Sequence, residues 1–377
     1  MKKIALLFVT ALLTGALATE IRGAALPAPK GLIRKLSLKN YSTEKNLQKL
    51  RGELKDNPYI NGVVIGTEGS LIEPERGKFD FAALDALIKV IDQANMDYKL
   101  FVMPGQSCPK YIYDGIKEKI NTFIINPHRQ NFGDKVIIPI PWDPFYKENL
   151  KRMFITVFGH YRADKHFIAT NLTGANFMSS EWHLPRKRAE DIAQWEAASP
   201  DYKNKIKDFW IEIFDFIAAL MPEKRMAIEA SSEIVYGMDE QADAIIEYGI
   251  AKYPGQFMVQ INQLDGNSDQ ITFDAFARLI RSNDRIIVGV QSLASVQAAM
   301  SGKDMRQGSM EMSVYNYLQS GSSYWELWDG DGADVATSKA VADQIKFASG
   351  LGVQGYKAWL ISKGKYIDAK PDNADKP

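Results

Sequence analysis

The sequence predicts a single-domain (β/α)8 TIM barrel. Short apolar runs alternate with amphipathic helical stretches along almost the whole chain of 377 residues, and this alternation is typical of repeated βα units. Eight of the apolar runs have the length of strands, which is the number that closes such a barrel. No stretch has the composition of a linker between domains. A doubly wound open sheet is the alternative that fits the same alternation.

The predicted strands are short apolar runs that contain β-branched and aromatic residues and are flanked by turn residues or helical patterns. They cover residues 31–38, 62–69, 98–105, 167–174, 225–230, 256–263, 285–292 and 322–328. The segments between them contain stretches in which apolar residues recur at steps of three and four, so each helix presents one apolar face to a sheet. The clearest predicted helices cover residues 81–94, 149–162, 204–221, 273–282 and 339–350.

The N-terminus has the features of a bacterial signal peptide. Two lysines precede the apolar run IALLFVTALLTG, and residues 16–18 form an A-x-A cleavage site. The run is too short to span a bilayer. We therefore expect cleavage before Thr19 and export to the periplasm or the cell exterior. Residues 28–365 then form the barrel domain, and residues 366–377 form a polar tail.

Composition excludes several classes of partner and chemistry. Lys and Arg together number 46 and so do Asp and Glu, so no net charge attracts nucleic acid or an anionic membrane surface. We expect neither a nucleic-acid partner nor membrane insertion. Cys108 is the single cysteine, which excludes an internal disulfide and makes packing the basis of stability. The four histidines show no ligand spacing, and we expect no metal and no cofactor.

In a TIM barrel the functional residues lie where the strands end. The predicted strand ends are rich in carboxylates, amides and tryptophans, and they contain no phosphate loop or nucleophile-elbow motif. Carboxylate acid–base chemistry remains. Two carboxylates with aromatic platforms are the minimal set of groups for cleaving a glycosidic bond. The sequence therefore predicts an oligo- or polysaccharide substrate.

Several blocks of the chain resemble clan A glycoside hydrolases, exported barrels related to cellulases and β-galactosidases. The resemblance rests on EPERGKFDF (73–81) with its flanking strands, on IPIPWDPFYKENLKRMF (138–154) and on FIATNLTGANFMSSEWHLP (167–185). It covers most of residues 60–331 and implies a glutamate after the fourth strand as general acid/base. Glu181 occupies that place. The chain departs from the pattern at Ser180, where members usually have Asn, and at Gln291, where they usually place the nucleophile.

We predict Glu181 and Glu326 as the catalytic pair. Glu181 is the predicted general acid, because Trp182, His183 and a mouth lined by tryptophans would desolvate its carboxyl and favour the protonated form. Glu326 is the predicted nucleophile or base, and whether the reaction retains or inverts configuration stays open. The predicted substrate-binding residues share a position at strand ends or in the insertion at 106–145: Glu68, Trp142, Asn176, Trp182, His183, Glu229, Asn262, Gln291, Trp325 and Trp328.

Some of these residues have structural alternatives. Glu181 could instead cap the segment that begins near Pro185, and Glu326 could form a buried ion pair with a Lys or Arg. Trp142 could be a sugar platform or a plug over the barrel. At the level of the whole protein, two other functions compete with hydrolysis: a barrel that only binds carbohydrate, and another exported enzyme such as a lyase or an esterase.

Overall fold

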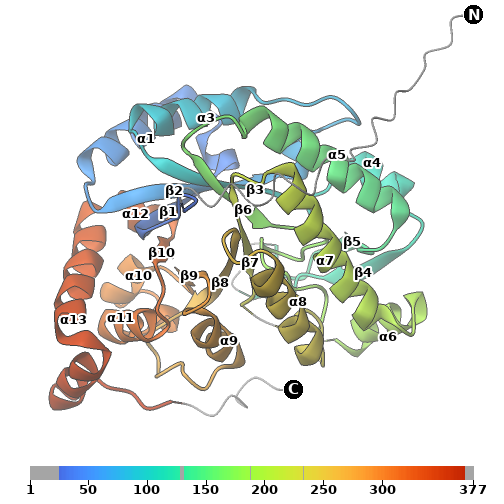
Figure 1. The fold of residues 1–377 in the computed structure, drawn as a ribbon. Coiled ribbons are helices and arrows are strands. Elements are labelled where there is room, and N and C mark those ends of the chain that lie inside the picture. The colour runs from blue at the N-terminus through green and yellow to red at the C-terminus, as the bar shows by residue number, and fades with distance from the viewer. Residues whose placement is uncertain (1–24, 128–130, 187, 232, 370–377) are drawn as a thin grey trace, which may run out of the picture.

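A computed structural model of the chain describes residues 25–127, 131–186, 188–231 and 233–369. Within them, eight parallel strands form a closed barrel in the order β1-β10-β9-β8-β7-β6-β3-β2 (Figure 1). The predicted TIM barrel is confirmed, and each of the eight predicted strand segments overlaps one barrel strand. The predicted signal peptide at 1–18, most of the polar tail and His128 lie outside the described residues.

The barrel strands are β1 (Gly31–Ser37), β2 (Ile60–Glu68), β3 (Asp97–Met103), β6 (Phe167–Leu172), β7 (Arg225–Glu229), β8 (Phe257–Leu264), β9 (Ile287–Ser292) and β10 (Tyr324–Leu327). The ring closes where β1 pairs with β10, with Gly31 opposite Tyr324. Gly31 has φ of 66°, a conformation that glycine adopts readily.

Helices surround the ring, as Figure 1 shows. The longer ones are α1 (Glu44–Asp56), α3 (Ala82–Gln93), α5 (Pro144–Tyr161), α6 (Ala189–Ala198), α7 (Tyr202–Leu220), α8 (Asp239–Lys252), α9 (Asp274–Ser282), α11 (Met310–Gln319) and α13 (Val335–Ser362). The shorter ones are η1 (Leu38–Tyr41), α2 (Gly69–Ile72), α4 (Lys110–Gly115), α10 (Val296–Met300), η2 (Met305–Gln307) and α12 (Asp329–Ala333). α5 begins five residues before the predicted start at 149, because Asp143 accepts a hydrogen bond from the Tyr146 N–H and Pro144 occupies the first turn.

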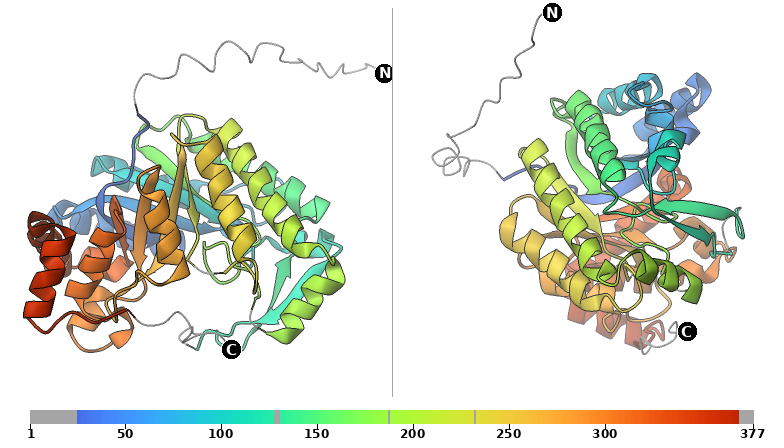
Figure 2. Two further views of the ribbon diagram at one scale, coloured as in Figure 1. Left: turned by 60° about the horizontal axis from the view of Figure 1, so that its bottom comes forward. Right: turned by 90° about the vertical axis from the view of Figure 1, so that its right-hand side faces the viewer.

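The insertion after β3 contains the antiparallel hairpin β4 (Lys119–Phe123) and β5 (Lys135–Pro139). The side chain of Gln194 on α6 pairs with the backbone of Asn121 on β4, accepting from its N–H at 2.8 Å and donating to its carbonyl at 2.9 Å. Figure 2 shows the hairpin beside α6, at the end of the barrel opposite the entry of the chain into β1. The insertion is therefore anchored to the segment that follows β6.

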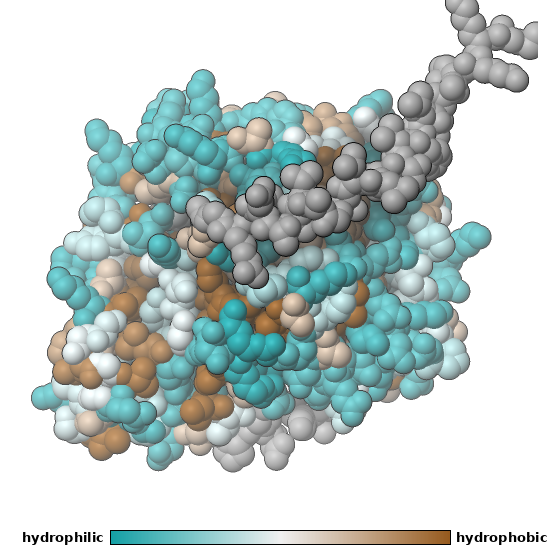
Figure 3. Space-filling view, viewed as in Figure 1, coloured by the Kyte–Doolittle hydropathy of each residue, from teal (hydrophilic) through white to brown (hydrophobic). Residues whose placement is uncertain are grey.

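The chain's last long helix, α13, has a break at Gly352, whose φ is 68°. Its buried residues include Val341 and Leu360, which join the main core. Its outer side leaves Phe347 and Leu351 each 44% exposed. Figure 3 shows brown apolar patches over the part of the surface where α13 and α11 lie.

Strand residues divide between two cores because successive side chains point to opposite faces. Val63 and Ile65 of β2 pack outward, in the large core between the strands and the helices. Val64 points inward, where it packs with Ile33 and Phe101 in a separate cluster inside the barrel. The barrel interior is thus a filled core, as closed eight-stranded barrels require.

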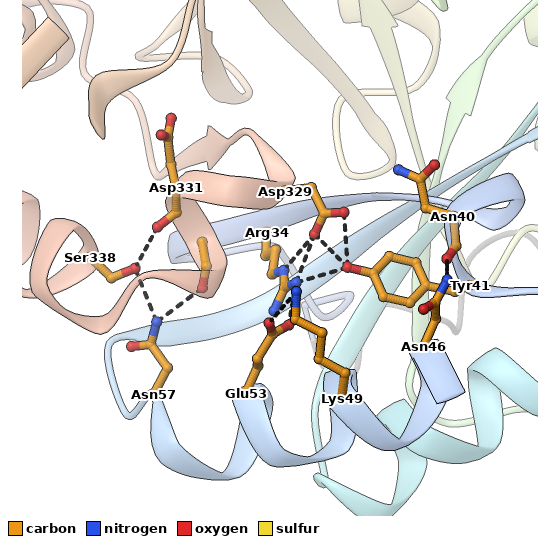
Figure 4. A network of polar contacts seen from close by, with 11 residues as sticks. Arg34, Asn40, Tyr41, Asn46, Lys49, Glu53, Asn57, Asp329, Asp331 and Ser338 are labelled. Atoms are coloured by element: carbon orange, nitrogen blue, oxygen red, sulfur yellow. Dashed lines mark hydrogen bonds and ion pairs between the residues drawn. The ribbon is translucent and has the colours of Figure 1, made fainter. Parts of the chain in front are cut away.

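A network of hydrogen bonds and ion pairs on the outside of the strands connects the first βα unit to the last. Arg34 of β1 donates to Glu53 of α1 at 2.7 Å and to Asp329 of α12 at 2.8 Å. The Tyr41 hydroxyl also donates to Asp329. Figure 4 shows these side chains converging from β1, α1 and the segment after β10. Because Arg34 is buried and paired with two carboxylates, this network stabilises closure of the ring.

A second polar cluster lies inside the barrel. The Lys99 ammonium on β3 donates to Glu326 of β10 at 2.7 Å and to Gln260 of β8 at 2.6 Å. The Gln260 amide donates to the second Glu326 oxygen at 3.0 Å. Lys99 and Glu326 are 1% and 0% exposed. Each charge is therefore compensated by groups that come from opposite parts of the ring, which the burial of charge requires.

Removing one partner of this buried pair should destabilise the fold strongly. We expect Lys99→Met to lower the free energy of unfolding by about 3–5 kcal/mol, because it leaves the Glu326 carboxylate buried without its counter-ion. The double variant Lys99→Met/Glu326→Leu should recover most of that loss. Lys110→Met, which breaks an exposed pair with Asp114, should cost less than about 1 kcal/mol. Denaturant unfolding measures all three, and a Lys99→Met variant as stable as the parent would contradict the assignment.

Candidate active site at the mouth of the barrel

The candidate site lies at the mouth of the barrel, meaning the end where the strands finish. The loop after β6 (173–188) carries Glu181 and is held by the side chain of Asn176. The Asn176 amide donates to the carbonyls of Ser180 at 3.0 Å and Glu181 at 2.6 Å, and its oxygen accepts from the Gly174 N–H. These contacts use the buried amide to shape the loop. Asn176, predicted to bind substrate, has the contacts of a loop brace.

The Glu181 carboxylate is partly exposed and lies next to His183. Glu181 Oε2 is 2.9 Å from His183 Nδ1, and the side chain of Glu181 is 15% exposed. Burial raises the pKa of Glu181, but His183, Ser231 and Arg186 favour the ionised form and together lower the pKa to about 2. Glu181 is therefore ionised at neutral pH. The prediction that desolvation keeps Glu181 protonated was wrong, because the hydrogen bonds and charges around this carboxyl outweigh the effect of burial.

Glu229, the last residue of β7, lies beneath this loop and is fully buried. Its carboxylate accepts from Ser180 Oγ at 2.5 Å, from Asn262 Nδ2 at 2.6 Å and from the amide of Asn171. Burial raises the pKa of Glu229, and the negative charge of Glu326 below adds to this effect. Lys35 acts in the opposite direction. The net effect is a raised pKa, so Glu229 is the carboxyl in this region that favours holding a proton.

The loops that carry these two glutamates support each other. Ser180 precedes Glu181 in sequence and donates to Glu229, while Ser231 follows Glu229 and forms a hydrogen bond with Glu181. The Trp182 N–H donates to the Glu229 carbonyl at 3.2 Å. Neighbouring strand ends thus hold two carboxyl groups in one polar network, with pKa values that their surroundings move in opposite directions.

Lys35 of β1 enters the mouth from the other side. Its ammonium donates to Gln291 Oε1 of β9 at 2.6 Å. It lies 5.2 Å from the ring centre of Trp328 and 5.8 Å from that of Phe101. Trp328 is 38% exposed, and its indole N–H donates to the Ser292 carbonyl. A flat exposed ring beside polar groups is suited to stacking on a sugar.

Glu326 requires a correction. It lies in the middle of the barrel, fully buried and ion-paired with Lys99, so it does not project from a strand end into one cleft with Glu181. The alternation along β10 explains the difference: Glu326 points inward at a level where the surrounding strands already enclose it. The structural alternative weighed for Glu326, a buried ion pair with a lysine, is the arrangement observed.

Three predicted sugar-binding tryptophans pack elsewhere. Trp325 points outward from β10, stacks on Tyr317 and donates to Ser292 Oγ at 2.8 Å. Trp182 is fully buried in the main core. Trp142 packs against Trp195 of α6, with ring centres 6.1 Å apart. Trp325 thus fills the layer between strands and helices, whereas Trp182 and Trp142 lie in the segments after β6 and β5 and pack against their surroundings there.

The structure therefore gathers part of the predicted set at the mouth. The predicted residues that share the polar network or line it are Glu181, His183, Glu229, Asn262, Gln291 and Trp328. Glu68 ends β2 at the same end of the barrel and is half-buried.

Sequence reasoning missed Lys35, Asn171, Arg186 and Ser231, which take part in the network or act on it. Ile33 of β1 points into the barrel, and Lys35 lies two residues later on the same face of the strand. The alternation of side chains along β1 could therefore have indicated a lysine directed into the barrel. Asn171 is the second-last residue of β6, and the same alternation of inward and outward side chains applies to it. Arg186 lies in an irregular loop, and no pattern in the sequence marks it.

Among the residues that the structure describes, no cluster of three or more His, Cys, Asp or Glu side chains could hold a metal ion. A cavity of about 300 Å³ lies at the other end of the barrel, where residues 27–30 cross the start of β1, β2 and β3.

In the described part of the chain, no helix has the length and apolar character needed to cross a bilayer.

Comparison with solved structures shows the same architecture. The catalytic domain of a β-amylase from Paenibacillus polymyxa superposes with a TM-score of 0.55 at 10% identity, covering 85% of this chain and 100% of that one. A psychrophilic family 10 endo-β-1,4-xylanase gives 0.48 at 9% identity, over 80% of this chain and 86% of that one. Xylanase 10B from Thermotoga petrophila RKU-1, in complex with xylobiose, gives 0.49 at 11%, over 79% and 82%.

These structural neighbours are glycoside hydrolases. The likeness to the β-amylase domain supports the TIM-barrel fold, and at 10% identity it shows the fold alone. No protein-family model and no curated protein matches the sequence.

The Glu181–His183 contact should make stability depend on acid pH. A carboxyl with a lowered pKa stabilises the fold above its unfolded value near 4.5, and this contribution disappears as the pH falls towards 2. Each factor of ten in proton affinity is worth about 1.4 kcal/mol, so the contribution is at most roughly 3 kcal/mol. Glu181→Gln should flatten this part of the stability profile, whereas Glu190→Gln on the exposed surface of α6 should not. Equal profiles for parent and Glu181→Gln would disprove the effect.

Proposed function

We propose that this chain is a glycoside hydrolase whose reaction takes place at the mouth of the barrel, with Glu181 and Glu229 as the acid–base pair. One observation carries the proposal: two carboxyls at neighbouring strand ends share a polar network, and their pKa values are moved apart. Groups separated in this way can divide the roles of acid and base. The fold is compatible, because a β-amylase catalytic domain has the same architecture.

In this proposal Glu229 supplies the proton to the leaving glycosidic oxygen. Its raised pKa favours the neutral acid, which is the form that a general acid needs before bond cleavage. Glu181, ionised, activates a water molecule or attacks the anomeric carbon. The role assigned to Glu181 thus changes from acid to base or nucleophile, and Glu229 replaces Glu326 as the second catalytic carboxyl. Both stereochemical outcomes stay open.

Access to Glu229 requires a movement of the loop after β6, because Ser180 covers its carboxyl. That loop contains Met178 at a φ of 68°, a conformation that non-glycine residues rarely adopt and that costs on the order of 1 kcal/mol or more. The Met178 N–H is held by Gln106 Oε1 at 3.0 Å. The strain at Met178 lowers the cost of a rearrangement of this loop when substrate binds.

The proposed substrate is an oligo- or polysaccharide that stacks on Trp328, and the proposed reaction needs no cofactor. Export, which the N-terminal residues predict, is also part of the proposal. The clan A resemblance also remains part of the proposal.

A second candidate is a barrel that binds carbohydrate without cleaving it. It is favoured by Gln291, an amide at the end of β9, and by the ion pair that holds Glu326. Release of reducing sugar from polysaccharides or aryl glycosides by the purified protein distinguishes the two candidates, since the second one predicts binding without turnover.

Substitution of each glutamate should affect different substrates. Glu229→Gln should slow cleavage of glycosides with poor leaving groups by roughly 10²- to 10⁴-fold and spare aryl glycosides with activated leaving groups, which depart with little protonation. Glu181→Gln should slow both classes, because it removes the base or nucleophile. Steady-state kinetics on matched alkyl and aryl glycosides measure this split.

The control is Glu190→Gln, at an exposed position on α6, which should keep parent activity on both substrate classes. Near-ultraviolet circular dichroism confirms that each variant folds. Parent-like cleavage of both classes by a folded Glu229→Gln variant would remove Glu229 from the mechanism.

A further inference from the structure

The Lys35 ammonium is held in a fixed position by neutral partners. Gln291 accepts one of its hydrogen bonds at 2.6 Å. The ring centres of Phe101 and Trp328 lie 5.8 and 5.2 Å from it, and cations are attracted to aromatic faces at these distances. The side chain is half-buried. Its position is thus fixed at the mouth before any ligand arrives.

This ammonium has no direct counter-ion within the described part of the chain. No carboxylate there lies within the 4.0 Å that defines an ion pair with its Nζ. The charge of Lys35 lowers the pKa of Glu229 through space, but the two groups do not form an ion pair. By contrast, Lys99, deeper in the barrel, has Glu326 at 2.7 Å. A half-buried cation without a paired anion is costly unless a ligand supplies the negative charge.

We propose that Lys35 binds an anionic group on the sugar, and that the substrate therefore contains a uronic acid. This inference rests on the proposed function, since it names the substrate class of that same site. An ammonium has three N–H donors, and Gln291 occupies one. The remaining donors face a carboxylate at C6 of a sugar ring stacked on Trp328, because the ammonium lies beside that exposed ring.

Paired ligands that differ only at C6 test the inference. Binding of 4-nitrophenyl glucuronide and glucoside, and of the matching galacturonide and galactoside, is measured by calorimetry with the α and β anomers of each. We expect the uronosides to bind roughly 10- to 100-fold more tightly than the neutral sugars, as charge-assisted hydrogen bonds allow. The 6-sulfated sugars form a further arm, and tighter binding of these than of the uronosides would replace carboxylate by sulfate as the recognised group.

Two substitutions separate recognition by Lys35 from general effects. Lys35→Met should abolish the preference for uronosides while leaving the dissociation constant for the neutral sugars within about threefold. Gln291→Glu gives Lys35 a counter-ion within the protein and should reduce the preference even if Lys35→Met fails to fold. The matched control is Lys30→Met, which removes one positive charge at the opposite end of the barrel and should change neither affinity.

Failure of the inference and failure of the proposed function give different results. Cleavage of neutral glycosides without any preference for uronosides, or a preference that survives both substitutions, overturns the role of Lys35 and leaves the hydrolase proposal standing. Tight binding of uronosides without cleavage supports Lys35 and contradicts hydrolysis. If none of the paired ligands binds at millimolar concentration, the inference is overturned.

Discussion

The site depends on the Lys99–Glu326 ion pair. Charged side chains that point into the closed barrel must be compensated there, because burial removes them from water. The two charges of this pair come from β3 and β10, on different parts of the ring. Gln260 bridges them from β8. If either charge were missing, the other would be buried without compensation. The pair therefore stabilises the interior and also sets the charge beneath the mouth.

That charge influences the chemistry one layer above. Burial is the main cause that raises the pKa of Glu229, and the negative charge of Glu326 adds to it, while Lys35 and Lys99 lower the pKa. The net result is a raised pKa. Glu181 lies in the loop after the neighbouring strand β6. Its pKa is lowered, chiefly because His183 Nδ1 lies 2.9 Å from Glu181 Oε2. Two glutamates on one network thus have pKa values moved in opposite directions, because burial dominates at Glu229 whereas the hydrogen bonds and charges of its neighbours dominate at Glu181.

Much of the fold follows from local patterns in the sequence. The eight strands were predictable because apolar runs and helical periodicity depend only on neighbouring residues. The site was less accessible to this reasoning. Glu326 and Trp325 are adjacent in sequence, and only the closed sheet decides that the first faces the barrel interior and the second the helices. Their roles follow from that geometry.

The same limit applies to contacts between distant segments and to the pKa values of the site residues. Trp142 and Trp195 meet because the insertion after β3 folds onto α6, a contact between distant segments that no periodicity predicts. The pKa of Glu181 depends on the position of the His183 ring. A sequence places these two residues close together but does not show which atoms meet.

The protonation state of Glu229 at neutral pH tests the account most directly. A pH titration of the glutamate carboxyl carbons by nuclear magnetic resonance, with Glu181→Gln and Glu229→Gln used to assign the two signals, measures both groups in the folded protein. The account predicts that the Glu229 signal titrates above the ordinary value of 4.5 and the Glu181 signal near 2. A Glu229 signal that titrates at or below 4.5 would contradict the division of roles between the two carboxyls.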